Sequence, residues 1–145
     1  MRISKKAEYA LRALVAISRH PGKSWSIQEL ATGEKIPIKF LEQILLSLRR
    51  AGILASKRGV GGGYTLLRNP AEISLGEVIT IFDGPTAPVA CAAEKPCEPC
   101  SCPDQRTCAL RLVMCDVRSR MTALLESVNV ETMLKSGAGA ESFDI

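Results

Sequence analysis

The sequence predicts a mainly α-helical protein that carries one small β-hairpin. Apolar residues recur at steps of three and four in five separate stretches, which indicates amphipathic helices. Between the third and the fourth stretch, two short runs of strand-forming residues flank a glycine-rich turn, and this pattern is typical of a hairpin. Aromatic residues make up only 4% of the 145 residues, so Leu, Ile, Val and Ala are expected to form the core.

The first two helices are delimited by their capping and terminating residues. Residues 3–19 are expected to form one helix, and a Pro-Gly pair shortly after it ends the helix because proline cannot continue the helical hydrogen bonds. Ser26 is expected to cap the next helix, since Glu29 three residues later completes a capping box. Gly33 is expected to stop this second helix.

A third helix and the hairpin follow. The third helix is expected to begin after Pro37 and to end at Gly52. Residues 53–57 and 64–67 are expected to be strands, with a basic, glycine-rich tip at residues 58–63. Consecutive glycines also occur in phosphate-binding loops, but such a loop needs a helix after the glycines, so nucleotide binding is excluded.

The C-terminal half is expected to contain one short and one long helix. Ser74 caps the short helix through a second capping box with Glu77. The long helix spans roughly residues 107–127. Its apolar residues follow the repeat of a helix–helix seam: Leu110, Met114, Val117, Met121, Leu124 and Val128. Because a small domain offers such a helix few internal partners, we expect a homodimer through residues 109–128.

Charge divides the chain into two unlike halves. Residues 1–70 carry 13 Lys or Arg against 4 Asp or Glu, whereas residues 71–145 carry 6 against 11. A basic segment of this kind is typical of a protein that binds a polyanion, although a merely solvated basic face gives the same count. No stretch approaches the length of a transmembrane helix and no secretory signal is visible, so a cytoplasmic protein without a membrane contact is expected.

Three helices followed by a two-stranded hairpin are the element order of a winged helix-turn-helix domain. A helix fits the major groove and a basic hairpin tip can enter the adjacent minor groove, so the expected partner is double-stranded DNA with a palindromic operator. The third helix is expected to read bases through Lys39, Glu42 and Gln43. The remaining expected DNA contacts are Ser26, Arg49, Arg50 and Lys57 on phosphates, and Arg58 and Gly61 in the wing.

All six cysteines lie between residues 91 and 115, with the intervals C-x5-C-x2-C-x-C-x5-C-x6-C. In a reducing compartment, such a cluster favours a metal site or a thiol switch over structural disulfides. Iron–sulfur clusters are held mainly by thiolates. Structural zinc also takes four cysteines, and a thiol switch would join Cys97 to Cys100 or Cys102 in a disulfide. The four thiols available to zinc are Cys97, Cys100, Cys102 and Cys108.

Several motifs carry a resemblance to a known family. They are MRISKKAEYALRAL at the start, FLEQILLSLRRAGIL in the third helix, KRGVGGGYTL in the hairpin, SLGEVITIFDG, and CALRLVM, in which a cysteine opens the long helix. With them the chain resembles the Rrf-type (second class) winged-helix transcriptional regulators, of the IscR/NsrR-like kind, over roughly residues 1–134. The resemblance implies a homodimeric bacterial transcription factor that places the wing arginine, Arg58, in the minor groove.

The resemblance also implies an iron–sulfur cluster, either [2Fe–2S] or [4Fe–4S], that is bound by three cysteines. Cys102 and Cys108 match the last two of these positions in spacing. The first position is open between Cys91 and Cys97, and Cys100 is an additional thiol that could replace Cys102.

A fourth ligand is implied from outside the cysteine segment. IscR-like members have a histidine where this chain has Arg111, which cannot bind iron. The resemblance to NsrR-like members instead points to the carboxylate of Glu8, for which a solvated charge beside Arg12 is the alternative. Cys115 follows the seam residue Met114 and is expected to be an ordinary buried small residue.

Four segments with separate roles are expected. They are a winged helix-turn-helix domain (1–84), a cysteine-rich sensor loop (85–108), a dimerisation helix with a short C-terminal helix (109–134) and a flexible tail (135–145). Cluster loss or oxidation is expected to release the loop and to change the angle between the two DNA-binding domains. The rival interpretation is a metal- or redox-dependent enzyme or a protein-interaction module. Against an enzyme, there is one histidine without an evident partner and no motif with paired carboxylates.

Overall fold

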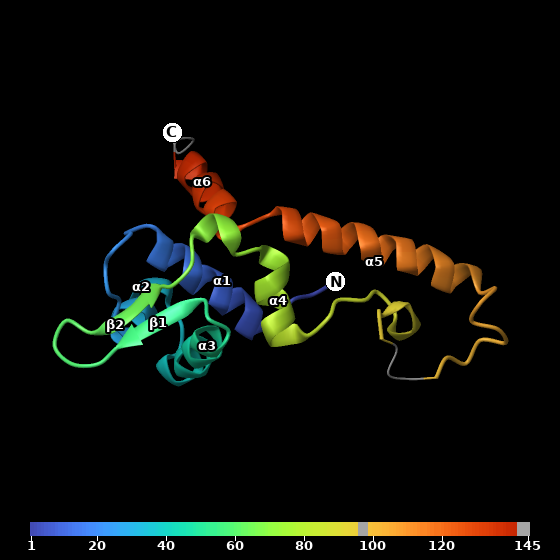
Figure 1. Cartoon of the computed structure of the whole chain (residues 1–145), viewed down its shortest axis with the longest axis horizontal. Coiled ribbons are helices and arrows are strands. Elements are labelled where there is room, and N and C mark those ends of the chain that lie inside the picture. The colour runs from blue at the N-terminus through green and yellow to red at the C-terminus, as the bar shows by residue number, and fades with distance from the viewer. Residues whose placement is uncertain (96–98, 142–145) are drawn as a thin grey trace.

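The structure, a computed structural model, describes residues 1–95 and 99–141. Helices and a hairpin form a head, from which one long helix and the cysteine-rich segment extend to the side (Figure 1). This arrangement confirms the predicted mainly α-helical class with a small hairpin. No helix in the described ranges has both the length and the hydropathy that crossing a bilayer requires. The elements are α1 (Lys5–Ser18), α2 (Ile27–Glu34), α3 (Ile38–Arg50), β1 (Leu54–Lys57), β2 (Gly63–Leu66), the 3₁₀ turn η1 (Pro70–Glu72), α4 (Leu75–Asp83), the 3₁₀ turn η2 (Ala90–Ala92), α5 (Ala109–Ser127) and α6 (Val130–Glu141).

One hydrophobic core holds the head together. α1 packs against α2, α3, α4 and α6, so its small and apolar residues lie at the centre of the head. α3 turns a stripe of four fully buried residues toward α1 because their spacing places them on one helix face. These four residues are Leu41, Ile44, Leu45 and Leu48. Burying a side chain of this size stabilises the fold by about 1.5–3 kcal/mol.

Serine side chains cap α2 and α4 as predicted. Ser26 forms a complete capping box, because its Oγ accepts from the Glu29 amide at 3.1 Å and its own amide donates to the Glu29 carboxylate at 2.9 Å. Ser74 accepts from the Glu77 amide at 3.0 Å. In a full capping box the Glu77 carboxylate would accept from the Ser74 amide. Here it instead accepts a charge-assisted hydrogen bond from Arg68 at 2.6 Å.

The end of α2 differs from the prediction. The helix continues through Gly33 to Glu34 and stops at Lys35, which has a left-handed conformation with φ of 54°. A single glycine costs a helix only about 1 kcal/mol, so Gly33 does not stop the helix by itself. The left-handed residue turns the chain so that Ile36 enters the core.

Trp25 fastens the hairpin to the helices. β1 and β2 pair in antiparallel register, with Lys57 opposite Gly63 at the start of the tip. On its other side β2 forms a bridge with the residue before the α2 cap: the Trp25 amide donates to the Tyr64 carbonyl at 2.9 Å, and the Tyr64 amide donates to the Trp25 carbonyl at 2.7 Å. The wing and the start of α2 are therefore held in one position relative to each other.

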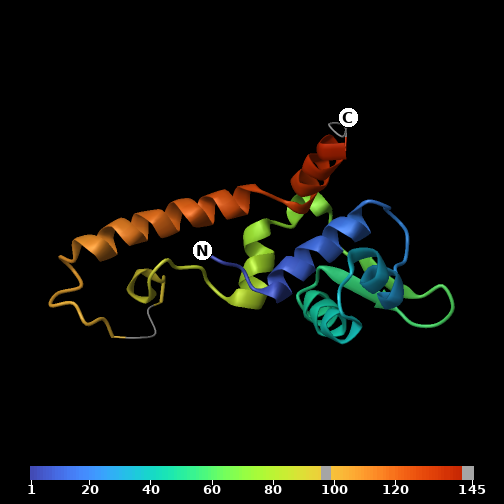
Figure 2. The ribbon, with the colours of Figure 1, turned by 180° about the vertical axis from the view of Figure 1, so that it is seen from behind.

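The C-terminal end of α5 meets the head, as the two opposite views show (Figures 1 and 2). The Leu75 amide at the start of α4 donates to the Val128 carbonyl at 2.7 Å, and the Val130 amide donates to the Ile73 carbonyl at 3.0 Å. Along its length α5 contacts α4 and η2, yet none of the residues of α5 itself is buried.

α6 is longer than the short helix that the sequence predicts. Residues 135–141, expected to be part of a flexible tail, continue α6 as a helix to Glu141. Val130 is fully buried and Met133 packs against the core, so the first turn of α6 is anchored on the head. Residues 142–145 of the expected tail lie outside the described residues.

The close approach of β2 to Trp25 generates a stability prediction. At Gly63, with φ of +150°, a Cβ would lie 2.3 Å from the Trp25 carbonyl oxygen, whereas at Gly61, with φ of +75°, it would meet nothing within 4 Å. Gly61→Ala should lower the free energy of unfolding by about 1 kcal/mol through backbone strain alone. Gly63→Ala should lower it by roughly twice as much or more, because the bridge must also open. Urea unfolding of both variants measures the difference, and equal losses would contradict the anchoring role of Trp25.

Candidate nucleic-acid interface and cysteine site

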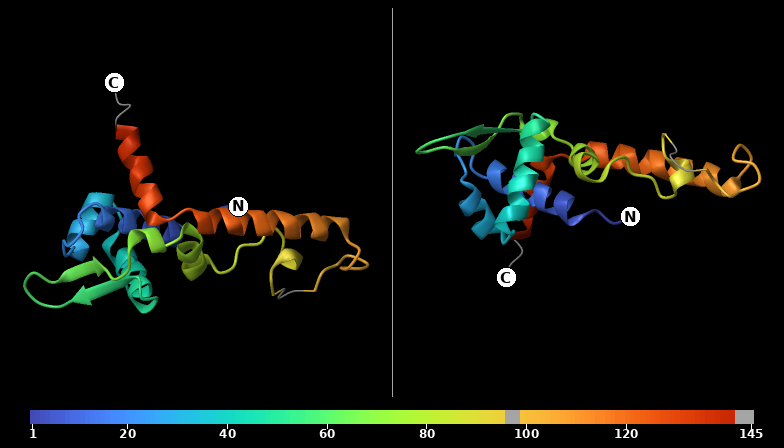
Figure 3. Two further views of the ribbon diagram at one scale, coloured as in Figure 1. Left: turned by 45° about the horizontal axis from the view of Figure 1, so that its top comes forward. Right: turned by 90° about the horizontal axis from the view of Figure 1, so that it is seen from below.

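α3 lies at the lower edge of the head in the left view of Figure 3. Opposite its buried stripe it carries exposed polar side chains. With about 100° of turn per residue, Lys39, Gln43 and Arg50 fall opposite the buried stripe, and Glu42 lies on the flank. All four side chains are exposed. The predicted base-reading residues are therefore on one accessible helix face.

Arg49 joins this face to the hairpin. Its guanidinium donates to Ser56 Oγ on β1 at 3.0 Å, which holds the side chain beside the wing. The guanidinium has five N–H donors, so it keeps donors for a phosphate. Arg50 is exposed and has no ion pair or side-chain hydrogen bond within the described residues. Both arginines stand at the C-terminal end of α3, where a cation is also favoured by the helix dipole.

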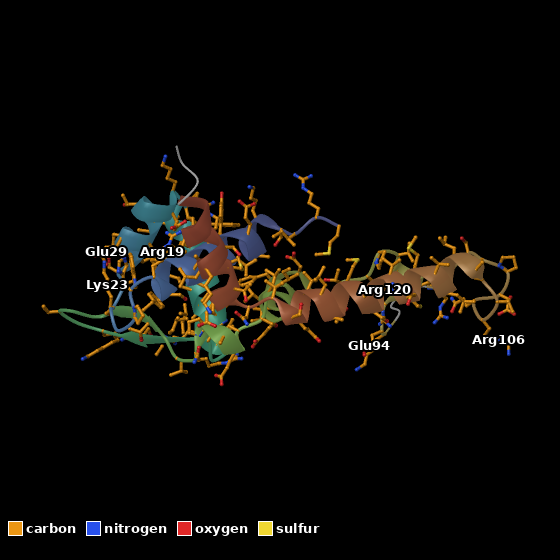
Figure 4. All side chains as sticks on the ribbon, turned by 90° about the horizontal axis from the view of Figure 1, so that it is seen from above. Arg19, Lys23, Glu29, Glu94, Arg106 and Arg120 are labelled. Carbon is orange, nitrogen blue, oxygen red and sulfur yellow. The ribbon has the colours of Figure 1, made fainter. Side chains whose placement is uncertain are left out.

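Ser26 lies at the start of α2 in a setting of mixed charge. Its oxygen accepts the Glu29 amide, so its hydroxyl proton remains available to a phosphate. The Ser26 backbone N–H, which binds the Glu29 carboxylate, holds the pKa of Glu29 below its usual value. That negative charge opposes a phosphate, and Lys23 offsets it with Nζ 3.6 Å from Glu29 Oε1 (Figure 4).

The wing tip is accessible. Lys57 and Arg58 are exposed, as is Gly61, which has φ of +75°. Val60 at the tip projects fully into solvent. The predicted wing contacts are thus open to solvent in this conformation.

Two residues of this interface were missed in the sequence. Trp25 positions the wing through backbone bonds, and no side-chain pattern signals such a bridge. Leu46 is 36% exposed on the polar face of α3. The signal for Leu46 was present, because it is the one leucine of this helix that falls outside the buried stripe.

The cysteine site is built from η2, the loop after it and the start of α5. Cys91 lies in η2 and Cys108 is the residue that precedes the first turn of α5. The thiols lie close enough to influence one another in a chain, Cys91 with Cys100, Cys100 with Cys102, and Cys102 with Cys108. Arg111 closes the site by donating from Nε to the Cys91 carbonyl at 3.1 Å.

The thiols differ in acidity because of these contacts. The hydrogen bond to Cys100 raises the pKa of Cys102 to about 11. Burial raises the pKa of Cys91 above its usual value. The backbone N–H of Cys102 lowers the pKa of Cys100, which makes Cys100 the first of the three to become a thiolate.

The donor set suits a metal or cluster, but the present geometry is not a ligand shell. Within residues 1–95 and 99–141, no three His, Cys, Asp or Glu side chains converge in the way that a metal ion requires. Cys97, a predicted ligand, lies outside the described residues.

Within one chain, Glu8 is not brought to any of the cysteines that the structure describes. It lies in the first turn of α1, where Lys5 Nζ is 2.8 Å and Arg12 Nη1 3.7 Å from its carboxylate oxygens. The hydrogen bond from Lys5 holds the pKa of Glu8 below its usual value. Among the described residues no interaction joins Glu8 to a thiol. Cys115, expected to be buried, is only half-buried on α5.

Comparison with known proteins identifies the family. The Rrf2 family model, described as iron-dependent transcriptional regulator, matches residues 3–136. The chain is 39% identical over 140 residues to an rrf2-like HTH-type transcriptional regulator of Rhodobacter capsulatus, with 93% of each protein covered. It is 28% identical over 145 residues to the HTH-type transcriptional regulator IscR of Vibrio atlanticus, covering 99% of this chain and 81% of that protein.

Solved structures share the fold over nearly the whole chain. CymR, the global cysteine regulator of B. subtilis, matches with a TM-score of 0.77 and 27% identity, covering 94% of this chain and 98% of CymR. IscR of T. potens matches with a TM-score of 0.74 and 26% identity, covering 97% and 90%. The chain therefore belongs to the Rrf2 family and is a transcriptional regulator, not an enzyme.

Proposed function

We propose that this Rrf2-family regulator is a homodimer that binds a palindromic operator in the cytoplasm, and that an iron–sulfur cluster on its cysteine loop modulates the binding. The single observation that carries the proposal is the placement of four neighbouring thiols beside the N-terminal end of α5, whose other end is bonded to the DNA-binding head. The proposal joins a DNA reader, a dimer surface and a sensor loop, and each part has its own support.

The DNA reader is supported by the exposed face of α3 and the wing. In this proposal Gln43 binds an adenine edge with its amide, Glu42 accepts from cytosine, and Lys39 binds guanine or phosphate. Arg58 enters the minor groove, where the negative potential is strongest. The phosphate contacts, from the start of α2, the end of α3 and the wing, carry no sequence information but set the register on the duplex. They are Ser26, Arg49, Arg50 and Lys57.

Base-reading and phosphate-binding residues should respond differently to substitution. Gln43→Ala should reduce discrimination at one base pair of each half-site by about 1–3 kcal/mol. Lys57→Ala should weaken binding to all sequences alike and reduce the slope of log affinity against log salt by about one. Fluorescence anisotropy on duplexes selected from a random pool measures both. Lys135→Ala on α6, whose lysine pairs with Glu131, is the control and should change neither quantity. Full sequence preference in Gln43→Ala would contradict the assignment of α3.

The dimer surface is supported by the apolar face of α5. Leu110, Val113 and Leu124 are 58%, 59% and 65% exposed. By helix spacing, Leu110 and Leu124 fall on the same face as Met114, Val117 and Met121. These three residues line a groove of about 560 Å³ together with the N-terminus and the end of α4. So large an exposed apolar face on a water-facing helix is typical of an interface, and the heptad spacing suits a second α5. We propose that this face binds the same face of a second copy around a two-fold axis.

A charge on this face should separate the subunits. Leu124→Glu should shift the protein from dimer to monomer, because two carboxylates would be buried near the two-fold axis without partners. Leu112→Glu is a matched control on the opposite face of the same helix, where the leucine is 53% exposed, and it should leave the dimer intact. Light scattering during size-exclusion chromatography reports the mass. A dimer in Leu124→Glu would contradict this interface.

The sensor loop is supported by the chemistry of its donors. Thiolates are the usual ligands of iron–sulfur clusters, and Cys102 and Cys108 are already in contact through their side chains. A bound cluster would supply a centre that oxidants and reactive small molecules alter. Cys108 would hold it at the start of α5, Cys102 from the loop, and Cys91 or Cys97 from the preceding segment, with Cys100 as a substitute. Arg111 would keep the Cys91 backbone in place beside α5.

Glu8 is proposed as the fourth ligand, reached across the dimer. Within the described part of its own chain, the carboxylate faces Lys5 and Arg12 and no thiol. A Glu8 ligand would therefore come from the second subunit, and it would tie one DNA-binding head to the other subunit's loop. Its lowered pKa keeps it ionised, which is the state that binds a cation.

Cluster binding should depend on Cys108 and not on Cys115. Protein isolated without oxygen should be brown and contain iron and sulfide, and Cys108→Ala should lose both. Cys115→Ala, a matched control on the same helix outside the chain of thiol contacts, should retain them. Glu8→Ala should keep some iron but change the Mössbauer spectrum. Colourless wild-type protein that contains zinc would contradict the cluster and favour a zinc site.

A thiol switch is the second candidate, and the contact between Cys100 and Cys91 favours it. The lowered pKa of Cys100 makes it the more nucleophilic thiol in this pair. Under a peroxide oxidant, the two thiols would form a disulfide and the peroxide would be reduced to water. Reducible disulfide in iron-free protein, with DNA affinity that follows its formation, would distinguish this candidate from the cluster.

A further inference from the structure

Leu46 is an apolar side chain on an otherwise polar face. It is 36% exposed, and it belongs neither to the buried core nor to the partly buried layer that packs against that core. Its neighbours one turn away on α3 are Glu42, Gln43 and Arg50, all exposed and polar. About a third of its surface remains open to solvent, although the other leucines of the helix are fully buried.

We propose that Leu46 is a specificity-determining residue that contacts the 5-methyl group of a thymine in each operator half-site. The inference rests on the proposed entry of α3 into the major groove. In the major groove the base edges expose hydrogen-bond donors and acceptors, and thymine also exposes an apolar methyl group. A leucine side chain in the major groove gains free energy from the burial of apolar surface when it packs against that methyl group.

The spacing along α3 places this contact near the base that Gln43 reads. Three residues advance about 4.5 Å along a helix axis, which is comparable with the 3.4 Å rise of a base pair. Leu46 therefore meets a thymine roughly one or two base pairs from the adenine at Gln43. The flanking Arg50 and Arg49 hold the helix against the backbone, so the leucine is pressed toward the groove rather than left in solvent.

The exposed apolar residues of α5 do not account for Leu46. They lie on a helix that extends away from the head, whereas α3 lies along the edge of the head itself (Figures 1 and 3). A dimer formed through α5 thus leaves the polar face of α3 free. The charges around this face favour an anionic partner, because Lys39, Arg49 and Arg50 lie on the same helix beside the basic wing.

The test removes the methyl group without changing any hydrogen bond. Each thymine of a selected operator is replaced in turn by uracil, and affinities of the wild type, Leu46→Ala and Leu46→Met are measured by fluorescence anisotropy. One uracil in each half-site removes two methyl groups from the operator and should weaken binding by the wild type about 15-fold, because each buried methyl-sized group contributes about fourfold. Leu46→Ala should bind thymine and uracil operators equally, and Leu46→Met should retain the preference. Leu67→Ala, a matched exposed leucine outside α3, should behave as the wild type.

The outcomes separate this inference from the proposed function. An equal uracil penalty in Leu46→Ala and the wild type, or no penalty at any thymine for the wild type, would overturn the role of Leu46 while DNA binding stands. Failure of the wild type to select any sequence would overturn the proposed operator binding itself. The Leu46 variants should have the same melting temperature as the wild type, because the Leu46 side chain is partly exposed. Equal melting temperatures would exclude a folding effect.

Discussion

Two backbone hydrogen bonds between residues 73–75 and 128–130 determine how the long helix leaves the head. They pair the segment that starts α4 with the linker that ends α5, and Gly76 lets α5 approach closely because a Cβ there would lie 3.3 Å from Leu125 Cβ. α5 then extends for 19 residues, about 28 Å, to the cysteine segment. In Figure 4, Arg106 at that end is far from Lys23 and Glu29 on the head. A change in the loop can therefore reach the head through one helix.

Much of the fold could be predicted because local signals and tertiary packing agree. The caps at Ser26 and Ser74, the leucine spacing of α3 and the glycine-rich tip each specify an element from a few neighbouring residues. The failures occur where packing outweighs local preference. α2 continues through Gly33, and α6 continues into a Gly- and Ala-rich stretch because its first turn is anchored in the core.

The candidate sites were predictable to different degrees for a physical reason. Exposure on α3 follows from helix periodicity, so Lys39, Glu42 and Gln43 could be placed from the sequence alone. The order of contacts among the cysteines depends on how a proline-containing loop folds between η2 and α5, and spacing does not determine it. The ion pairs of Glu8 with Lys5 and Arg12 are local. The ligand role proposed for Glu8 involves the cysteine loop of a second subunit, and no local pattern in the sequence predicts such a contact.

Arg12 connects Glu8 on α1 to the C-terminal end of α2. Its guanidinium lies between two carboxylates, 3.7 Å from Glu8 and 3.6 Å from Glu34, and it also donates to the Glu34 carbonyl at the end of α2. Glu8 and Glu34 thus share Arg12, while Lys5 also pairs with Glu8 and Arg19 also pairs with Glu34. If Glu8 turned toward another subunit, Arg12 would be left to Glu34, and the balance of charge at the C-terminal end of α2 would change. The opposite end of that helix begins at the Ser26 cap beside the Trp25 bridge, so the shared arginine links the first turn of α1 to the helix whose start holds the wing.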